Sequence, residues 1–342
     1  AGRAPARPVA LLLPGQGSQY AGMATGLYGH EPAFTAAVDD VLRHMGPDGQ
    51  RVRDDWLGIT STVDVDDVRR AQPLLFAVDY GLVRMLESWG VRPVAMLGHS
   101  AGELVAATLA GVFTLRDAVR AQLDRVRFTA GVPTGGMLAV AATAEQVRPY
   151  LTGDVAIAAV NASRQTMLAG TTGWLAQVRS RLTGAGMTVA VVPASSPFHS
   201  PAMAVVARRT EPGLAAMSLR PPERTMYSGY TGELLGAADA TTPRFWARQV
   251  TDTVHFAAAL DRLLGARDVL LVEAGPGQTL TSFARRHPAV RRGTSDAVAL
   301  LPRGAAGDPG TVVAAAARIW AEGHDLHLPG VAGLARCAAA AR

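Results

Sequence analysis

The sequence contains no lysine, and all 33 of its basic side chains are arginines. The formal net charge is +5, but the arginines are scattered along the chain and form no basic stretch. Nucleic-acid binding needs a concentrated basic surface, so we do not expect a nucleic-acid partner. An acidic protein partner is compatible with this charge.

Cysteine is nearly absent as well, since Cys337 is the only one. A single cysteine excludes an internal disulfide and argues against a cysteine-based metal site. No apolar run approaches the roughly 20 residues of a membrane-spanning helix, and no signal-peptide pattern precedes the first strand. We therefore expect a cytoplasmic protein that binds no membrane. The opening AGRAPARP is typical of a linker, which suggests a domain excised from a longer polypeptide.

Short apolar runs alternate with helical patterns, which predicts an α/β protein with a parallel sheet. Residues 9–13 should form the first strand, followed by a Pro-Gly-Gln-Gly turn that leads into a helix. From residue 132 to 197, four short strands and two helical stretches follow the βαββαβ order of a ferredoxin-like fold. We expect a discontinuous large domain (1–131 and 198–305), an inserted small domain (132–197) and a C-terminal linker (306–342).

One serine stands in a pattern that carries chemistry. Residues 98–102 read Gly-His-Ser-Ala-Gly, which fits the G-x-S-x-G nucleophile elbow. An apolar strand pattern precedes the motif and a helical pattern follows it, as an elbow requires. We therefore predict a hydrolase-like large domain with Ser100 as its nucleophile, the alternative being a glycine-rich turn without chemistry. The helix start also offers the N–H of Ala101 to an oxyanion.

A serine nucleophile needs a base, and histidine is the usual one near neutral pH. His199 follows the predicted small domain, which places it at a cleft between the domains; a purely structural histidine is the alternative. His99 should point away from the elbow and be structural. No acid stands in a triad pattern after the elbow, so a backbone carbonyl could hold the imidazole tautomer in a Ser-His dyad.

Seven segments carry a resemblance to a known family. Between about residues 8 and 303 the chain contains, in order, LLLPGQGSQYAGM, AQPLLFAVDY, GHSAGE, LDRVRF, NASRQTMLAG, SPFHSP and VEAGPGQTL. This order resembles malonyl-CoA:acyl carrier protein transacylases and the acyltransferase domains of modular polyketide synthases. The tail, with IWAEGHDLHLPG, resembles the linker that follows such a domain.

The resemblance implies a role for five residues, of which Gln249 lies outside the seven segments. Ser100 would be acylated, with His199 as its general base. The backbone N–H groups of Gln16 and Ala101 would form the oxyanion hole, and the main-chain carbonyl of Gln249 would hold the histidine. It also implies no metal or redox cofactor. The implied partners are a malonyl-type CoA thioester, an acyl carrier protein domain and a neighbouring ketosynthase domain.

The resemblance further implies how the acyl group is selected. Arg125 would bind the free carboxylate of a malonyl-type group, for which its planar fork of donors is suited. Gln72, Pro197 and Phe198 would line the pocket, and Asn161 would shape the cleft from the small domain. A phenylalanine directly before the catalytic histidine resembles the malonyl-selective pattern.

The sequence leaves three alternatives open. Ser196-Pro197 and the small Ala101 depart from the usual pattern and could enlarge the pocket for a substituted malonyl group. A thioesterase or esterase would use the same nucleophile and base, although a carboxylate clamp would serve it little. A non-catalytic docking module would be expected to lack the nucleophile or the base, and both are present.

Overall fold

The computed structural model describes residues 6–60, 63–192, 194–303 and 308–328. Its larger sheet has five parallel strands in the spatial order β7–β2–β1–β8–β9, as the alternating sequence pattern predicts. The strands are β1 (Val9–Leu13), β2 (Ala95–Gly98), β7 (Met226–Tyr227), β8 (Leu270–Pro276) and β9 (Asp296–Leu301). Every residue of the central strand β1 is buried, because helices cover both faces of the sheet.

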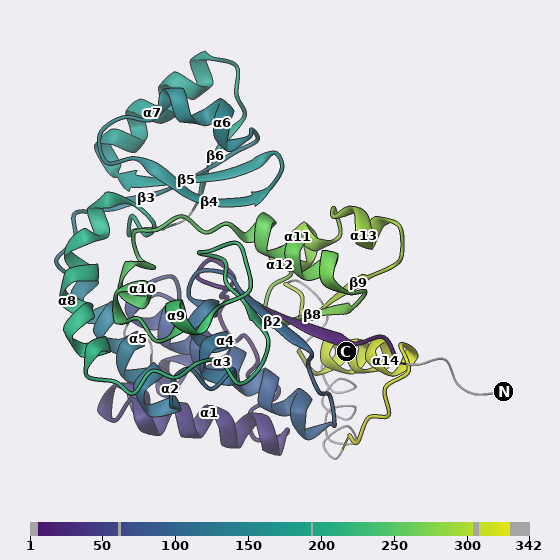
Figure 1. The fold of residues 1–342 in the computed structure, drawn as a ribbon. Helices are drawn as coiled ribbons and strands as arrows, with labels where there is room; N and C mark the ends of the chain where they lie inside the picture. Colours follow the sequence, from purple (N-terminus) through teal and green to yellow (C-terminus); the bar gives the residue numbers. More distant parts are fainter. Residues whose placement is uncertain (1–5, 61–62, 193, 304–307, 329–342) are drawn as a thin grey trace.

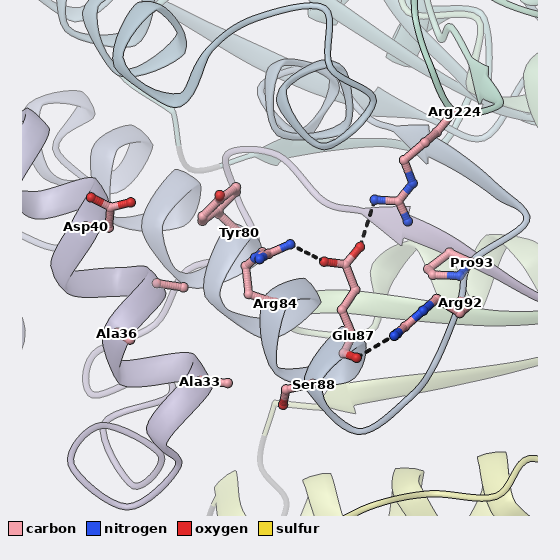
Figure 2. A pocket seen from close by; sticks show the side chains of 11 residues that line it. Ala33, Ala36, Asp40, Tyr80, Arg84, Glu87, Ser88, Arg92, Pro93 and Arg224 are labelled. Carbon is pink, nitrogen blue, oxygen red and sulfur yellow. Dashed lines mark hydrogen bonds and ion pairs between the residues drawn. The ribbon is translucent and has the colours of Figure 1, made fainter.

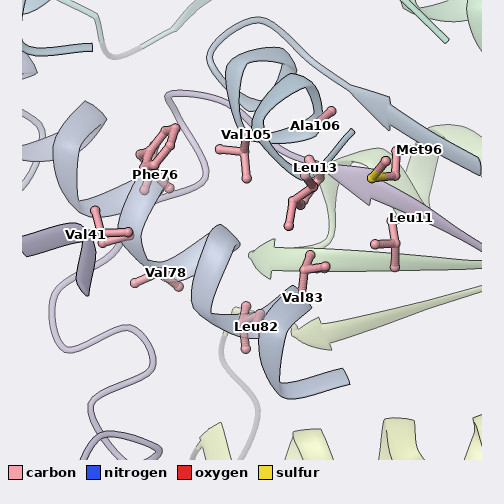
Figure 3. Packing of buried hydrophobic residues seen from close by; sticks show 14 of the residues in the cluster. Leu11, Leu13, Val41, Phe76, Val78, Leu82, Val83, Met96, Val105 and Ala106 are labelled. Carbon is pink, nitrogen blue, oxygen red and sulfur yellow. The ribbon is translucent and has the colours of Figure 1, made fainter. Parts of the chain in front are cut away.

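Successive side chains of β1 point to opposite faces and enter two apolar clusters. Leu11 and Leu13 belong to the cluster that includes α3 (Val68–Ser88), and Figure 3 shows part of this packing. Leu12 belongs to the cluster that includes α11 (Phe256–Ala266). The other helices of this part of the molecule are α1 (Pro32–His44), α2 (Pro47–Trp56), α4 (Gly102–Leu109), α5 (Leu115–Thr129), η2 (Pro201–Met203), α8 (Ala204–Ala215), α9 (Ala237–Ala240), α10 (Pro243–Arg248), α12 (Thr279–Ala284) and α13 (Pro288–Arg291).

One predicted element is wrong, because the Pro-Gly-Gln-Gly turn does not lead directly into a helix. Residues 14–31 form a series of turns, and the first helix begins only at Pro32. Three glycines of this segment and Ala24 have positive φ angles. A right-handed helix cannot pass through such positions, so the chain makes a longer excursion.

The predicted small ferredoxin-like unit is present as a four-stranded antiparallel sheet in the order β4–β5–β3–β6. The first and third strands of the unit thus lie in the centre. Its elements are β3 (Gly135–Val140), α6 (Ala144–Val147), η1 (Arg148–Tyr150), β4 (Ala156–Ala162), β5 (Gln165–Thr171), α7 (Thr172–Gly184) and β6 (Val189–Val192). In Figure 1, α6 and α7 lie on the face of this sheet that points away from the large domain.

The C-terminal segment folds back onto the large domain as far as it is described. Helix α14 (Asp308–Ala321) packs along β9, and Ile319 is fully buried. Residues 329–342 of the expected linker lie outside the described part of the chain. None of the helices in the described ranges is long and apolar enough to cross a membrane.

Candidate active site

Ser100 lies in a sharp turn between β2 and α4. Its φ of +53° is a left-handed conformation that residues other than glycine rarely adopt and that fits a nucleophile elbow. A Cβ on Gly98 would lie 2.3 Å from the Cα of Glu103, and one on Gly102 would lie 2.2 Å from the carbonyl oxygen of Leu13. The glycines of the G-x-S-x-G spacing are therefore a steric requirement of this turn.

His199 is in direct contact with the serine. Its Nε2 lies 2.7 Å from Ser100 Oγ, and its Nδ1 lies 3.0 Å from the main-chain carbonyl oxygen of Asp252. A carbonyl thus takes the place of a triad acid. The backbone of Gln249, the residue expected to hold the ring, also hydrogen-bonds to the imidazole. A turn after α10 brings the Asp252 carbonyl to the imidazole ring. In this turn the N–H groups of residues 251 and 252 both donate to the main-chain carbonyl of Arg248.

The surroundings of His199 keep its imidazole neutral. Burial is the main cause that lowers the pKa of His199 to about 4. The neighbouring His99 and Arg125 lower this pKa further, while the hydrogen bond to the Asp252 carbonyl opposes them. At pH 7 the ring is therefore unprotonated, which is the state that a general base needs.

Two backbone N–H groups beside Ser100 have no acceptor. Among the described residues, neither the N–H of Gln16 nor that of Ala101 donates a hydrogen bond to the protein. Gly15 brings the two loops together, since a Cβ there would lie 3.2 Å from the Ala101 nitrogen. Unpaired donors at a helix start can stabilise a developing oxyanion.

Arg125 is a buried cation that forms no direct ion pair with any described residue. It lies on α5 with 8% of its surface exposed, and its guanidinium makes no ion pair or hydrogen bond with any other described residue. Burial lowers the pKa of Arg125, but a guanidinium stays protonated at neutral pH. A buried unpaired charge is costly, so this site is suited to a ligand that brings a negative charge.

Glu103 attracts this charge electrostatically but forms no direct ion pair with it among the described residues. Burial raises the pKa of its carboxyl to about 8, although Ser228 Oγ and the Gly229 N–H donate hydrogen bonds to it at 2.5 and 2.8 Å. The attraction of Arg125 opposes that rise.

A cavity of about 290 Å³ lies over the dyad, between the two sheets. Gln72 and Phe198 line it, as expected. Pro197 does not line it, which corrects that expectation: the ring packs against β3, where a Cβ on Gly135 would lie 2.6 Å from its Cβ. Arg125 is not among the residues that line this cavity.

The small domain contributes to the cavity through Asn161. Its Oδ1 lies 2.8 Å from Nε2 of His99, and both side chains line the cavity. His99 was expected to point away from the elbow, but its side chain lines the cavity and helps to lower the pKa of His199. Asn161 lies in the cavity wall, where it was expected to shape the cleft.

Two larger hollows lack comparable chemistry. The first, of about 750 Å³, lies where β2 begins, and Figure 2 shows Arg84 and Arg224 both paired with the Glu87 carboxylate. The second, of about 1070 Å³, lies between α2 and α5 and mixes basic with acidic side chains. Among the described residues that line them, neither hollow holds a serine in contact with a histidine. The candidate site is the smaller cavity.

A protein-family model described as "Acyl transferase domain" matches residues 11–309. The chain belongs to this family. Among its relatives, a phenolphthiocerol/phthiocerol polyketide synthase of Mycobacterium tuberculosis is 38% identical to this acyltransferase domain over 281 residues, which cover 82% of this chain. They cover only 19% of that protein, so the chain corresponds to about one fifth of it.

Solved structures agree with this assignment. The acyltransferase domain from the second module of the salinomycin polyketide synthase is 32% identical, with a TM-score of 0.87 over 97% of this chain and 77% of that one. The acyl transferase domain of SpnD, solved as a complex with 2-(pent-4-yn-1-yl)malonyl, is 30% identical, with a TM-score of 0.86 over 94% of this chain and 78% of that one. The fold is that of polyketide synthase acyltransferase domains.

Three residues of the acyltransferase site were not predicted from the sequence. Asp252 acts through its carbonyl, which no side-chain motif reveals. Glu103 was present in the GHSAGE segment but had no assigned role. Tyr230 lies beside the dyad, with its ring centroid 6.0 Å from that of His199, and burial raises the pKa of its phenol despite a hydrogen bond to Ser100.

The lowered pKa of His199 predicts the pH dependence of Ser100 acylation. Only the neutral imidazole can accept the serine proton, so the rate should fall on acidification through about pH 4 and stay level between about pH 5.5 and 7. Single-turnover acylation followed by rapid quench and intact mass spectrometry measures this profile. An acid limb centred near the ordinary histidine value of about 6.5 would contradict the assigned environment.

Proposed function

We propose that this domain transfers a malonyl-type acyl group from CoA to the phosphopantetheine thiol of an acyl carrier protein. As Ser100 Oγ attacks the thioester carbonyl, His199 accepts the serine proton. The carbon–sulfur bond breaks, and His199 returns the proton to the departing CoA thiolate. The carrier thiol then attacks the serine ester in the reverse sequence, so the kinetics should be ping-pong.

The N–H groups of Gln16 and Ala101 stabilise the tetrahedral oxyanion in both half-reactions. They are preorganised for this, because neither is engaged by another acceptor of the described chain. Preorganised donors of this kind are among the largest contributions to acyl-transfer rates. The chain's own residues therefore supply the nucleophile, the base and the electrostatic stabilisation.

The buried, unpaired Arg125 is the observation that carries the substrate class. A carboxylate at the distal end of the acyl group would give this cation the direct ion pair that the described residues do not provide. SpnD, the relative solved with a malonyl analogue, is consistent with that ligand type. A general thioesterase or esterase would have no use for such a charge.

The partners follow from the same proposal. Since the chain corresponds to a fraction of its multidomain relatives, the carrier protein and a ketosynthase would be neighbouring domains of one synthase. We further propose that residues 1–131 with 198–305 act as the large domain, 132–197 as the small domain, and 306–342 as the segment that leads to the next domain.

The extender unit that we favour is malonyl, with a methyl- or alkylmalonyl group as the alternative. The Phe198 ring lines the cavity, and its centroid lies 6.4 Å from that of His199. A branch on the acyl α-carbon would need room beside this ring. Ala101 would act in the opposite sense if it bordered the acyl group, although it is not among the residues that line the cavity. A methyl group excluded by shape changes selectivity by only about 1 to 3 kcal/mol, so we expect a preference rather than exclusion.

Replacing Arg125 should remove the selection for a free carboxylate. Arg125→Ala should lose roughly 2 to 5 kcal/mol of discrimination between malonyl-CoA and acetyl-CoA, the scale for truncating one member of a buried charge pair. The measurement is kcat/KM for Ser100 acylation with each ester. Arg120→Ala, an exposed arginine on the same helix, is the matched control and should leave the ratio unchanged. Equal efficiency of the two esters with the unmutated domain would refute the carboxylate clamp.

Competition between extender units tests the role of Phe198. With malonyl-CoA and methylmalonyl-CoA at equal concentration, malonyl-enzyme should predominate, and Phe198→Ala should shift loading toward the branched unit by about 5- to 100-fold. The ratio of the two adducts is read by intact mass spectrometry. Predominant loading of the branched unit by the unmutated domain would show that this ring does not set the selectivity.

A further inference from the structure

Three hydrogen-bonded glutamine side chains connect helix α5 to the loop after β1. Gln122 Nε2 donates a hydrogen bond of 2.7 Å to Gln72 Oε1, and Gln72 Nε2 donates one of 3.0 Å to Gln16 Oε1. Gln122 and Gln72 are 1% and 3% exposed, whereas Gln16 is only partly buried. Gln16, the last of the three, is the residue whose N–H is proposed to form part of the oxyanion hole.

Gln122 has no evident packing reason to be polar. It faces α3 from a helix whose other buried positions include Ala118, Val119 and Val126. A buried amide costs free energy unless its hydrogen bonds are made, and an aliphatic residue would pack there without that cost. The hydrogen bond to Gln72 is therefore what this glutamine provides.

The loop that contains Gln16 is held on both sides of this residue. Gly15 packs against the elbow, and the Gly17 N–H donates to Gln19 Oε1 at 2.7 Å. Within the described residues, the side chain of Gln16 hydrogen-bonds only to Gln72, and its own N–H has no protein acceptor. The contact with Gln72 is therefore the hydrogen bond that holds the Gln16 side chain itself.

We propose that Gln122 is a positioning residue for the oxyanion loop, acting through Gln72 and Gln16. Gln122 fixes the direction of the Gln72 amide, so that its NH₂ group points toward the loop and holds Gln16. Because Gln122 and Arg125 lie three residues apart on one helix, they share a face of α5. The helix that carries the carboxylate-binding arginine therefore also supports the group that stabilises the oxyanion, which extends the proposed function.

The test uses a reagent that needs the oxyanion hole but carries neither CoA nor a carboxylate. Phenylmethylsulfonyl fluoride should modify Ser100, and intact mass spectrometry gives the rate. Gln122→Met, which preserves side-chain length, should slow modification by about 10- to 100-fold, since a displaced donor costs less than a lost one. Gln177→Met on the exposed face of α7 is the matched control and should react at the unmutated rate.

Epistasis separates positioning from a general structural role. Gln16→Met, at a partly exposed position, should slow modification to a similar extent even if Gln122→Met folds poorly. The double variant should be no slower than either single variant, because both remove the same support. With malonyl-CoA, kcat should fall while KM and the malonyl-to-acetyl preference persist.

Two outcomes would overturn the proposal: unmutated rates for Gln16→Met, or losses that multiply in the double variant. These results are independent of the proposed function, since the sulfonyl fluoride reports on Ser100 whether or not malonyl transfer occurs. Absence of malonyl transfer with the expected sulfonyl fluoride pattern would refute the function and leave the positioning role supported.

Discussion

The contact of 2.7 Å between Ser100 and His199 joins two backbone positions that are both left-handed, with φ angles of +53° and +64°. Such conformations cost free energy and persist where the surrounding structure holds them. At the serine, Gly98 and Gly102 allow β1, β2 and α4 to approach closely. At the histidine, the N–H of the residue itself donates to the carbonyl of Val250 at 2.7 Å. The dyad therefore depends on backbone geometry that two distant segments impose together.

The electrostatics of the site follow from burial. The imidazole is neutral, burial raises the pKa of the Glu103 carboxyl, and a carbonyl takes the place of a triad acid. Arg125 has no direct ion pair with any described residue, although Glu103 attracts it electrostatically. A cation without a direct ion pair can bind a substrate carboxylate, and its positive charge favours a neutral base.

Local patterns made Ser100 and the two sheets predictable, because the elbow motif and the apolar strands depend on residues adjacent in the sequence. Asp252 was not predictable, since its role depends on a turn that brings its carbonyl to the imidazole in addition to the backbone of Gln249. Pro197 was misplaced for a similar reason: adjacent residues at a loop point in different directions, and Phe198 lines the cavity whereas Pro197 does not. Gln122 had no signal at all, because a glutamine on a helix is usually solvent-exposed.

The covalent intermediate is the central claim, and mass spectrometry tests it directly. After incubation with a panel of malonyl-type CoA esters, the unmutated domain should gain the mass of one acyl group, mapped to Ser100. Addition of a carrier domain should move that mass to the carrier's phosphopantetheine, and Ser100→Ala should acquire no adduct. Labelling that survives in Ser100→Ala, or an acyl-enzyme that water discharges as fast with as without the carrier, would contradict the account.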